Sequence, residues 1–194
     1  IGKLYYFYIC TLIKNKQTMN EIIKKNAITF GIIAAIISIL VTSMIYIIDI
    51  KLFTAWWIGI IKITAFVVLA IILLTKTKKE LNNILSFKDA FTTYFICFLI
   101  SIGLASVFEI LLFNVIDPSL KESVQELSIE TAVDMMKKFG TATSEIKKAV
   151  EEMSKTNQFD TLQILKGSAF AIIFSSIFGL IFAAIFKSKP QEQF

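Results

Sequence analysis

Four apolar stretches, each about as long as a helix that crosses a bilayer, constrain this chain more than any other feature. They cover residues 27–48, 56–74, 90–116 and 168–186. The hydrocarbon core of a membrane takes roughly 20 helical residues to cross, and a helix satisfies its own backbone polar groups there. A soluble protein could bury such a stretch, but hydrophobic residues make up 56% of the chain and leave too little polar surface to cover four. We therefore predict an all-α integral membrane bundle of four transmembrane helices.

The long connection between the third and fourth spans, residues 117–167, has helical signals of its own. Asp117-Pro118 is typical of a helix N-cap followed by proline in the first turn, and Gly140 of a helix stop. Apolar residues recur at helical spacing before Gly140 and again over residues 144–154. Asp160 is placed to cap a further start that runs into the last span. We predict an extramembrane amphipathic helical hairpin that lies over the outer mouth of the bundle, with its apolar faces turned to the spans or the membrane. The alternative is that the two helices only solvate the connecting loop.

Lysine carries all of the positive charge and predicts the orientation in the membrane. The chain has 20 basic residues, all Lys, and a net charge of +5. A basic chain can bind nucleic acid, but here the lysines gather beside apolar stretches, as they do on cytoplasmic flanks. Both termini and the loop between spans two and three are therefore predicted to be cytoplasmic, and residues 117–167 extracytoplasmic. The lysines on the cytoplasmic side are Lys14, Lys16, Lys24, Lys25, Lys76, Lys78, Lys79, Lys88, Lys187 and Lys189.

The chain is expected to form a single membrane domain over residues 19–189. Residues 1–18 precede Met19, which resembles a natural start, so this segment is interpreted as an over-extended N-terminus. The alternative is an interfacial segment carrying the aromatic residues Tyr5–Tyr8. Residues 190–194 are expected to be a C-terminal tail.

Small residues recur at intervals of four in two of the spans. Small side chains let helix backbones approach closely in lipid, so we predict that the first and fourth spans pack together, antiparallel. Packing within one chain is the preferred interpretation, and a dimerisation face is the alternative. The predicted packing stripe consists of Gly167, Ala171, Ser175, Gly179 and Ala183 in the fourth span, and Ala27, Gly31 and Ala35 in the first.

Two ionisable residues interrupt the apolar stretches. Lys62 lies six residues after Trp56 in the second span, and Glu109 lies seven residues before Ile116 in the third. The predicted topology puts both at a similar depth, so an ion pair is expected. Intramembrane charges are costly and often functional, which makes a proton or ion relay the functional interpretation. A structural pair, or Lys62 extending its amine to the interface, is the preferred alternative.

The sequence contains few residues of the kinds that form catalytic or metal sites. The chain has no His and two Cys, at positions 10 and 97, so neither a nucleophile–His pair nor a zinc or haem site is expected. No glycine-rich phosphate loop is present. We predict a protein that is not an enzyme and has no cofactor, metal or nucleic-acid partner.

Two short motifs resemble those of a known family. LSFKDAF at Leu85–Phe91 enters the third span, and IDP at Ile116–Pro118 leaves it, followed by an acidic amphipathic helix. In order and spacing these are similar to an uncharacterised bacterial membrane family, found mostly in Bacteroidota and known as a domain of unknown function, numbered 4199. The resemblance covers about residues 19–189 and implies an inner-membrane location but no activity.

Two functional hypotheses follow. The first is a non-enzymatic structural or accessory subunit of the bacterial inner membrane, whose partners are the bilayer and a membrane protein or a second copy of the chain. The alternative is a small transporter or channel that uses Lys62 and Glu109, with Asn114 or Thr64.

Overall fold

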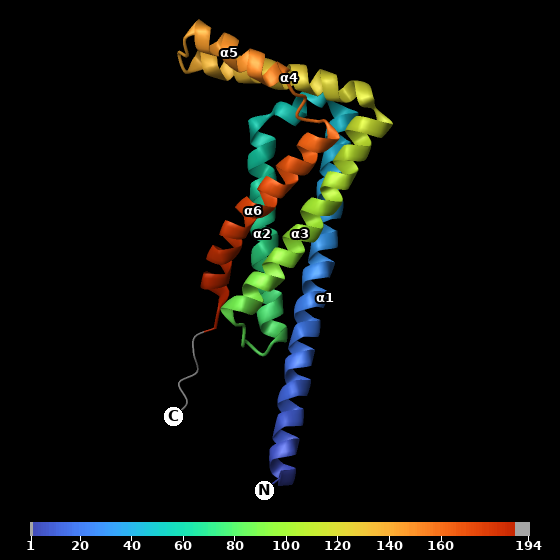
Figure 1. Cartoon of the computed structure of the whole chain (residues 1–194), viewed down its shortest axis with the longest axis vertical. Coiled ribbons are helices and arrows are strands. Elements are labelled where there is room, and N and C mark those ends of the chain that lie inside the picture. Colours follow the sequence, from blue (N-terminus) through green and yellow to red (C-terminus); the bar gives the residue numbers. More distant parts are fainter. Residues whose placement is uncertain (1, 189–194) are drawn as a thin grey trace. The chain divides into compact units, whose positions relative to one another are not determined.

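The computed structural model describes the backbone of residues 2–188 and the side chains of residues 21–188. The fold is all-helical, with 88% helix and no strand in the described part of the chain. Four helices are long: α1 (Gly2–Ile48), α2 (Trp56–Glu80), α3 (Phe87–Leu111) and α6 (Thr161–Phe186) (Figure 1). Shorter elements connect them: the 3₁₀ turn η1 (Ile50–Thr54), the π-helical turn η2 (Leu112–Ile116), α4 (Pro118–Lys138) and α5 (Thr143–Ser154).

Four helical segments are long and apolar enough to cross a membrane, which confirms the predicted number of spans. They are Glu21–Ile48, Trp56–Glu80, Phe87–Ile116 and Thr161–Phe186. Each of them includes the predicted span, and all four begin or end several residues beyond it. Backbone hydrogen bonding does not stop where the side chains become polar, so the helices continue past the apolar edges by which the spans were predicted.

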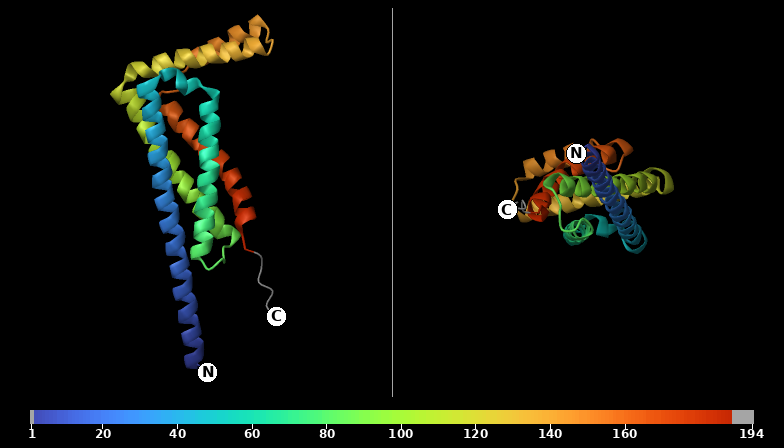
Figure 2. Two further views of the ribbon diagram at one scale, coloured as in Figure 1. Left: turned by 180° about the vertical axis from the view of Figure 1, so that it is seen from behind. Right: turned by 90° about the horizontal axis from the view of Figure 1, so that it is seen from below.

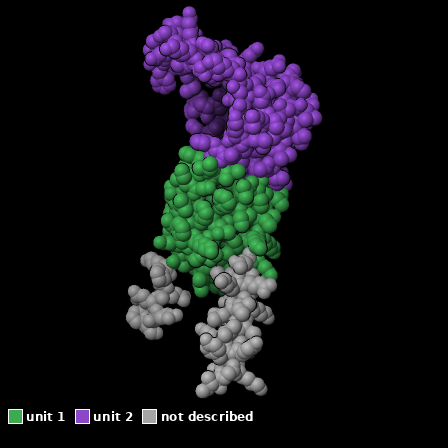
Figure 3. Space-filling view, viewed as in Figure 1, with its two compact units in different colours: residues 1–34, 65–101, 172–194 green, residues 35–64, 102–171 purple. Residues whose placement is uncertain are grey.

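The chain forms two compact units, which Figure 3 colours separately. Unit 1 consists of residues 1–34, 65–101 and 172–194, and unit 2 of residues 35–64 and 102–171. Each long helix contributes one segment to each unit.

The core of unit 1 gathers side chains from all four long helices. Ala27 of α1, Leu73 of α2, Cys97 of α3 and Ala183 of α6 are all fully buried in it. Tyr94 stacks on Phe98, with their ring centroids 4.1 Å apart, and on Phe182 of α6. α3 therefore contributes the aromatic centre of this core.

Two glycines bring helix backbones against α3. A Cβ atom at Gly31 of α1 would lie 2.8 Å from the backbone oxygen of Cys97, and one at Gly179 of α6 would lie 2.7 Å from the Tyr94 ring. Both glycines therefore face α3, and the predicted packing of the first span on the fourth stays a prediction. The spacing of small residues marks a helix face that permits close approach, but it does not say which helix approaches.

The predicted stripe in α6 is buried over only part of its length. Gly179 and Ala183 are buried, and Ser175 is half-buried. Ala171 and Gly167 are exposed, and a Cβ atom at Gly167 would meet nothing within 4 Å. In α1, by contrast, Ala27, Gly31 and Ala35 are all buried.

Polar contacts hold the C-terminal ends of α2 and α6 in unit 1. The buried Asn26 amide of α1 donates hydrogen bonds to Thr77 Oγ1, at 3.2 Å, and to Glu80 Oε2, at 2.8 Å. After α6, the Ser188 hydroxyl donates to the Asn83 carbonyl and accepts from the Leu85 amide. The end of α6 is thereby tied to the turn between α2 and α3.

The core of unit 2 lies where α4 meets the turns at the ends of the spanning helices. Leu120 and Val124 of α4 are buried with Leu112 and Phe113 of η2 and with Ile164 of α6. α4 also contacts η1. Figures 1 and 2 show α4 and α5 lying across the helix ends of unit 2.

α4 begins and ends where the sequence predicts. Asp117 is the N-cap, its carboxylate accepts from the Leu120 amide, and Pro118 occupies the first turn. The helix ends before Gly140, whose φ of +73° suits a residue without a Cβ atom. The extramembrane position of α4 and α5 stays a prediction.

The predicted terminal segments are only partly described. The backbone of residues 2–18 belongs to α1, while the side chains of residues 1–18 lie outside the described ones. The predicted tail, residues 190–194, also lies outside them.

We expect Gly31→Ala to destabilise the protein by about 1–3 kcal/mol, because the added methyl group would overlap the Cys97 carbonyl. Gly103→Ala is the matched control, since a Cβ atom there meets nothing within 4 Å. It should be neutral, or stabilising by up to about 1 kcal/mol through helix propensity. Thermal unfolding in detergent measures both, and equal melting temperatures would contradict the close approach of α1 to α3.

Candidate functional site

Lys62 and Glu109 both lie in unit 2, and both are half-buried. The positive charge of Lys62 is near enough to act on the Glu109 carboxylate. No ion pair within 4.0 Å joins these two described side chains, however, so their interaction is electrostatic and acts over a longer distance. The structure thus brings together the two charges that the sequence singled out, without the direct contact that was expected.

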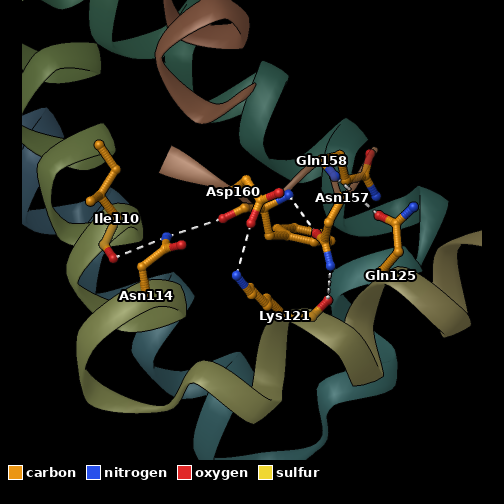
Figure 4. Close-up of polar contacts among 8 residues, drawn as sticks. Ile110, Asn114, Lys121, Gln125, Asn157, Gln158 and Asp160 are labelled. Carbon is orange, nitrogen blue, oxygen red and sulfur yellow. Dashed lines mark hydrogen bonds and ion pairs between the residues drawn. The ribbon is translucent and has the colours of Figure 1, made fainter. Parts of the chain in front are cut away.

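Thr64 and Asn114, which were proposed to assist this pair, form hydrogen bonds elsewhere. The Thr64 hydroxyl donates to the Ile60 carbonyl one turn earlier in α2. The Asn114 amide of η2 donates to the carbonyls of Ile110 and Phe159, at 3.3 and 3.1 Å. Asn114 therefore ties η2 to the segment that precedes α6 (Figure 4).

A group of polar residues fastens that same segment to α4 through side-chain and backbone groups. We call it the polar clasp, and Figure 4 shows it. Lys121 Nζ lies 2.8 Å from Asp160 Oδ1, and the Asn157 amide donates to the Lys121 carbonyl at 3.2 Å. The polar clasp consists of Lys121, Gln125, Asn157, Gln158 and Asp160.

Gln125 is the most buried member of the polar clasp and uses both ends of its amide. Its Nε2 donates to the Met153 carbonyl of α5 at 2.8 Å. Its Oε1 accepts from the Gln158 backbone amide at 3.2 Å. With only 9% of its surface exposed, Gln125 satisfies two backbone groups that would otherwise lack a partner in a partly buried place. It thereby joins α4, α5 and the segment before α6.

A second polar contact fixes the start of α4. The Tyr46 hydroxyl of α1 donates to Asp117 Oδ2 at 3.1 Å, and the Ser119 hydroxyl donates to Asp117 Oδ1 at 2.6 Å. The hydrogen bond from Ser119, assisted by that from Tyr46, lowers the pKa of Asp117 below its usual value. The N-cap carboxylate is therefore ionised at neutral pH, the form that best accepts these bonds.

Of the residues in the polar clasp, only Asp160 was predicted from the sequence, as a helix cap. Lys121 and Asp160 are 39 residues apart, and neither belongs to a motif that would pair them. The only local signal is the run of amide side chains at Asn157-Gln158, just before the last long helix.

The described side chains suggest no metal centre. Among residues 21–188, no group of three or more His, Cys, Asp and Glu side chains could hold a metal ion. The site in unit 2 therefore offers hydrogen-bond donors, hydrogen-bond acceptors and one well-formed ion pair, which position helices.

Comparison with known families decides the relationship of this chain. A family model described as "Protein of unknown function (DUF4199)" matches residues 29–188. The chain belongs to the DUF4199 family. No curated protein and no solved structure matches it. The matched part of this DUF4199 protein includes the whole connection between the third and fourth spans, and with it the polar clasp and the Lys62–Glu109 pair.

We expect Gln125→Ala to loosen the connection before α6, because it leaves the Met153 carbonyl and the Gln158 amide without their partner. The expected cost is about 1–3 kcal/mol. Hydrogen–deuterium exchange in detergent should show faster exchange over residues 153–159. Glu126→Ala, at the exposed neighbouring position, is the control and should leave exchange there unchanged. Equal exchange in the two variants would show that the polar clasp does not hold this segment.

Proposed function

We propose that this DUF4199 protein is a non-enzymatic accessory subunit of a membrane assembly, and that it meets its partner through α4 and α5. The observation that carries the proposal is the polar clasp. Antiparallel helices need only about 2–8 residues to connect them. Here 44 residues, 117–160, lie between η2 and α6, and the polar clasp holds them in a defined arrangement. Such an arrangement suits a surface that a partner recognises.

The surface offered by α4 has a distinct charge. Glu122, Glu126 and Glu130 are exposed and follow one another at intervals of four residues, so they lie along one side of the helix. Charged groups at the surface steer association and select partners more than they add affinity. We infer a partner with a basic surface opposite this acidic row.

The lysine distribution supports an extracytoplasmic position for this surface, in a bacterial inner membrane with both termini of the protein in the cytoplasm. Lys78 and Lys79 occupy the last turn of α2, and Lys187 follows α6, whereas η1 at the other end of α2 carries only Lys51. An accessory role also agrees with the absence of His from the sequence, which removes the commonest general base.

The test is affinity purification of the tagged full chain from native membranes in mild detergent, with quantitative identification of the proteins that accompany it. Replacing Glu122, Glu126 and Glu130 together by Lys should reduce recovery of the specific partner several-fold. The matched control is Glu151→Lys with Glu152→Lys on α5, both exposed, which should retain the partner. Unchanged elution volume in size-exclusion chromatography shows that the variants fold. The same proteins recovered with the wild type, both variants and an unrelated four-span protein would refute the accessory role.

A small transporter is the second candidate, and the electrostatic interaction of Lys62 with Glu109 favours it. Two half-buried charges on α2 and α3 could bind an ion or relay a proton. On this candidate, Lys62→Met and Glu109→Gln should each abolish an ion or proton flux in proteoliposomes. Lys51→Met, at an exposed position in η1, should leave that flux intact. If no variant differs from empty liposomes, the pair is structural.

A further inference from the structure

One side of α4 is mostly apolar, with a single threonine in its middle. Its members follow one another at intervals of three or four residues, so they lie on the same side. We call this side the underside of α4; it consists of Leu120, Val124, Leu127, Thr131, Met135 and, at the cap, Phe139.

Exposure rises steadily along the underside. Leu120 and Val124, at the start of α4, are 4% and 0% exposed. Leu127 and Thr131 are half-buried. Met135 is 49% exposed and Phe139 is 83% exposed. The first half of this side is thus covered by other residues of unit 2, whereas the second half is left uncovered.

The partner of the first half indicates which way the underside faces. Leu120 and Val124 pack on Leu112 and Phe113 of η2, the turn that ends the third span. α4 also contacts η1, the turn that connects the first span to the second. The underside therefore faces the ends of the spanning helices. Figure 1 shows α4 and α5 of unit 2 reaching beyond those ends.

α5 does not cover the end of the underside, because Met135 and Phe139 remain exposed beside it. Gln125, whose amide donates to the Met153 carbonyl of α5, is not part of the underside. At the end of α4, Gly140 adopts a φ of +73° that reverses the chain directly after Phe139. The exposed phenylalanine consequently stands at the tip of a two-helix arm, next to Lys137 and Lys138.

We propose that the distal underside, from Leu127 to Phe139, rests in the headgroup layer of the bilayer that the four spans cross. Where α4 reaches past the helix ends, a face that looks toward those ends meets lipid in place of protein. Aromatic and apolar side chains bind at the boundary between headgroups and acyl chains, and lysines beside them attract anionic headgroups. Met135 and Phe139 supply the apolar contacts, and Lys138 supplies the charge. This placement is independent of the accessory role and leaves the acidic row of α4 directed away from the lipid.

The test uses the purified full chain in nanodiscs of phosphatidylcholine and phosphatidylglycerol. In a background with Cys10→Ser and Cys97→Ala, single spin labels are attached through Met135→Cys and Phe139→Cys. Glu126→Cys and Glu130→Cys, on the acidic row of the same helix, are the matched controls. All four positions are exposed, so the labels do not disturb the core, and a melting temperature equal to that of the unlabelled background verifies the fold.

Collision rates with oxygen, which dissolves in lipid, and with a water-soluble nickel chelate give the outcome. We expect the ratio of oxygen to nickel collisions to be several-fold higher at positions 135 and 139 than at 126 and 130. Equal ratios at all four positions would overturn the proposal by placing the arm in water. Exclusion of both reagents from 135 and 139 would also overturn it, because it would mean that protein, a second copy or a partner, covers this face.

Discussion

Hydrocarbon removes the usual reason for helices to associate, and the contacts in this DUF4199 protein reflect that constraint. Lipid tails are as apolar as Leu and Ile, so burying one apolar helix against another gains little from the hydrophobic effect. What remains is close packing and the pairing of polar groups. In unit 1 this takes the form of Gly31 and Gly179 against α3. In unit 2 the hydroxyls of Ser106 and Ser168 pair between α3 and α6. Exposed isoleucines and phenylalanines cover the remaining helix surfaces, as suits side chains that face lipid.

Outside the apolar stretches the chain uses a different kind of contact. α4 is anchored at its start by Tyr46 and Ser119, which both donate to Asp117, and further along by the polar clasp. These bonds are directional, so they fix where α4 and α5 lie as well as holding them. The result within unit 2 is an arm with one acidic side and one apolar side. A protein partner and the lipid surface can therefore contact the arm on different faces without competing.

The sequence was sufficient wherever the determining signal is local. Hydrophobic length predicted four spans, and Asp117-Pro118 and Gly140 predicted the two ends of α4, because caps and turns depend on neighbouring residues. The small-residue stripe includes Gly31 and Gly179, which both approach α3, while the packing of the first span on the fourth stays a prediction. The polar clasp was largely missed, since its bonds join residues far apart in sequence. Lys62 and Glu109 were singled out by their similar depth; their charges interact, but the direct ion pair that was expected is not among the contacts of these two described side chains.

The contacts of α6 also bear on when the two cores of this protein can be completed during folding. Ala183 and Phe182 belong to the core of unit 1, Ile164 belongs to that of unit 2, and Ser188 ties the end of α6 to the turn before α3. Synthesis proceeds from the N-terminus, so α6 is the last of the four long helices to leave the ribosome. Neither core is complete before that moment. Until α6 is in place, the Tyr94 ring lacks its contact with Phe182, and the cluster that contains Leu120 lacks Ile164. The last long helix therefore completes both units.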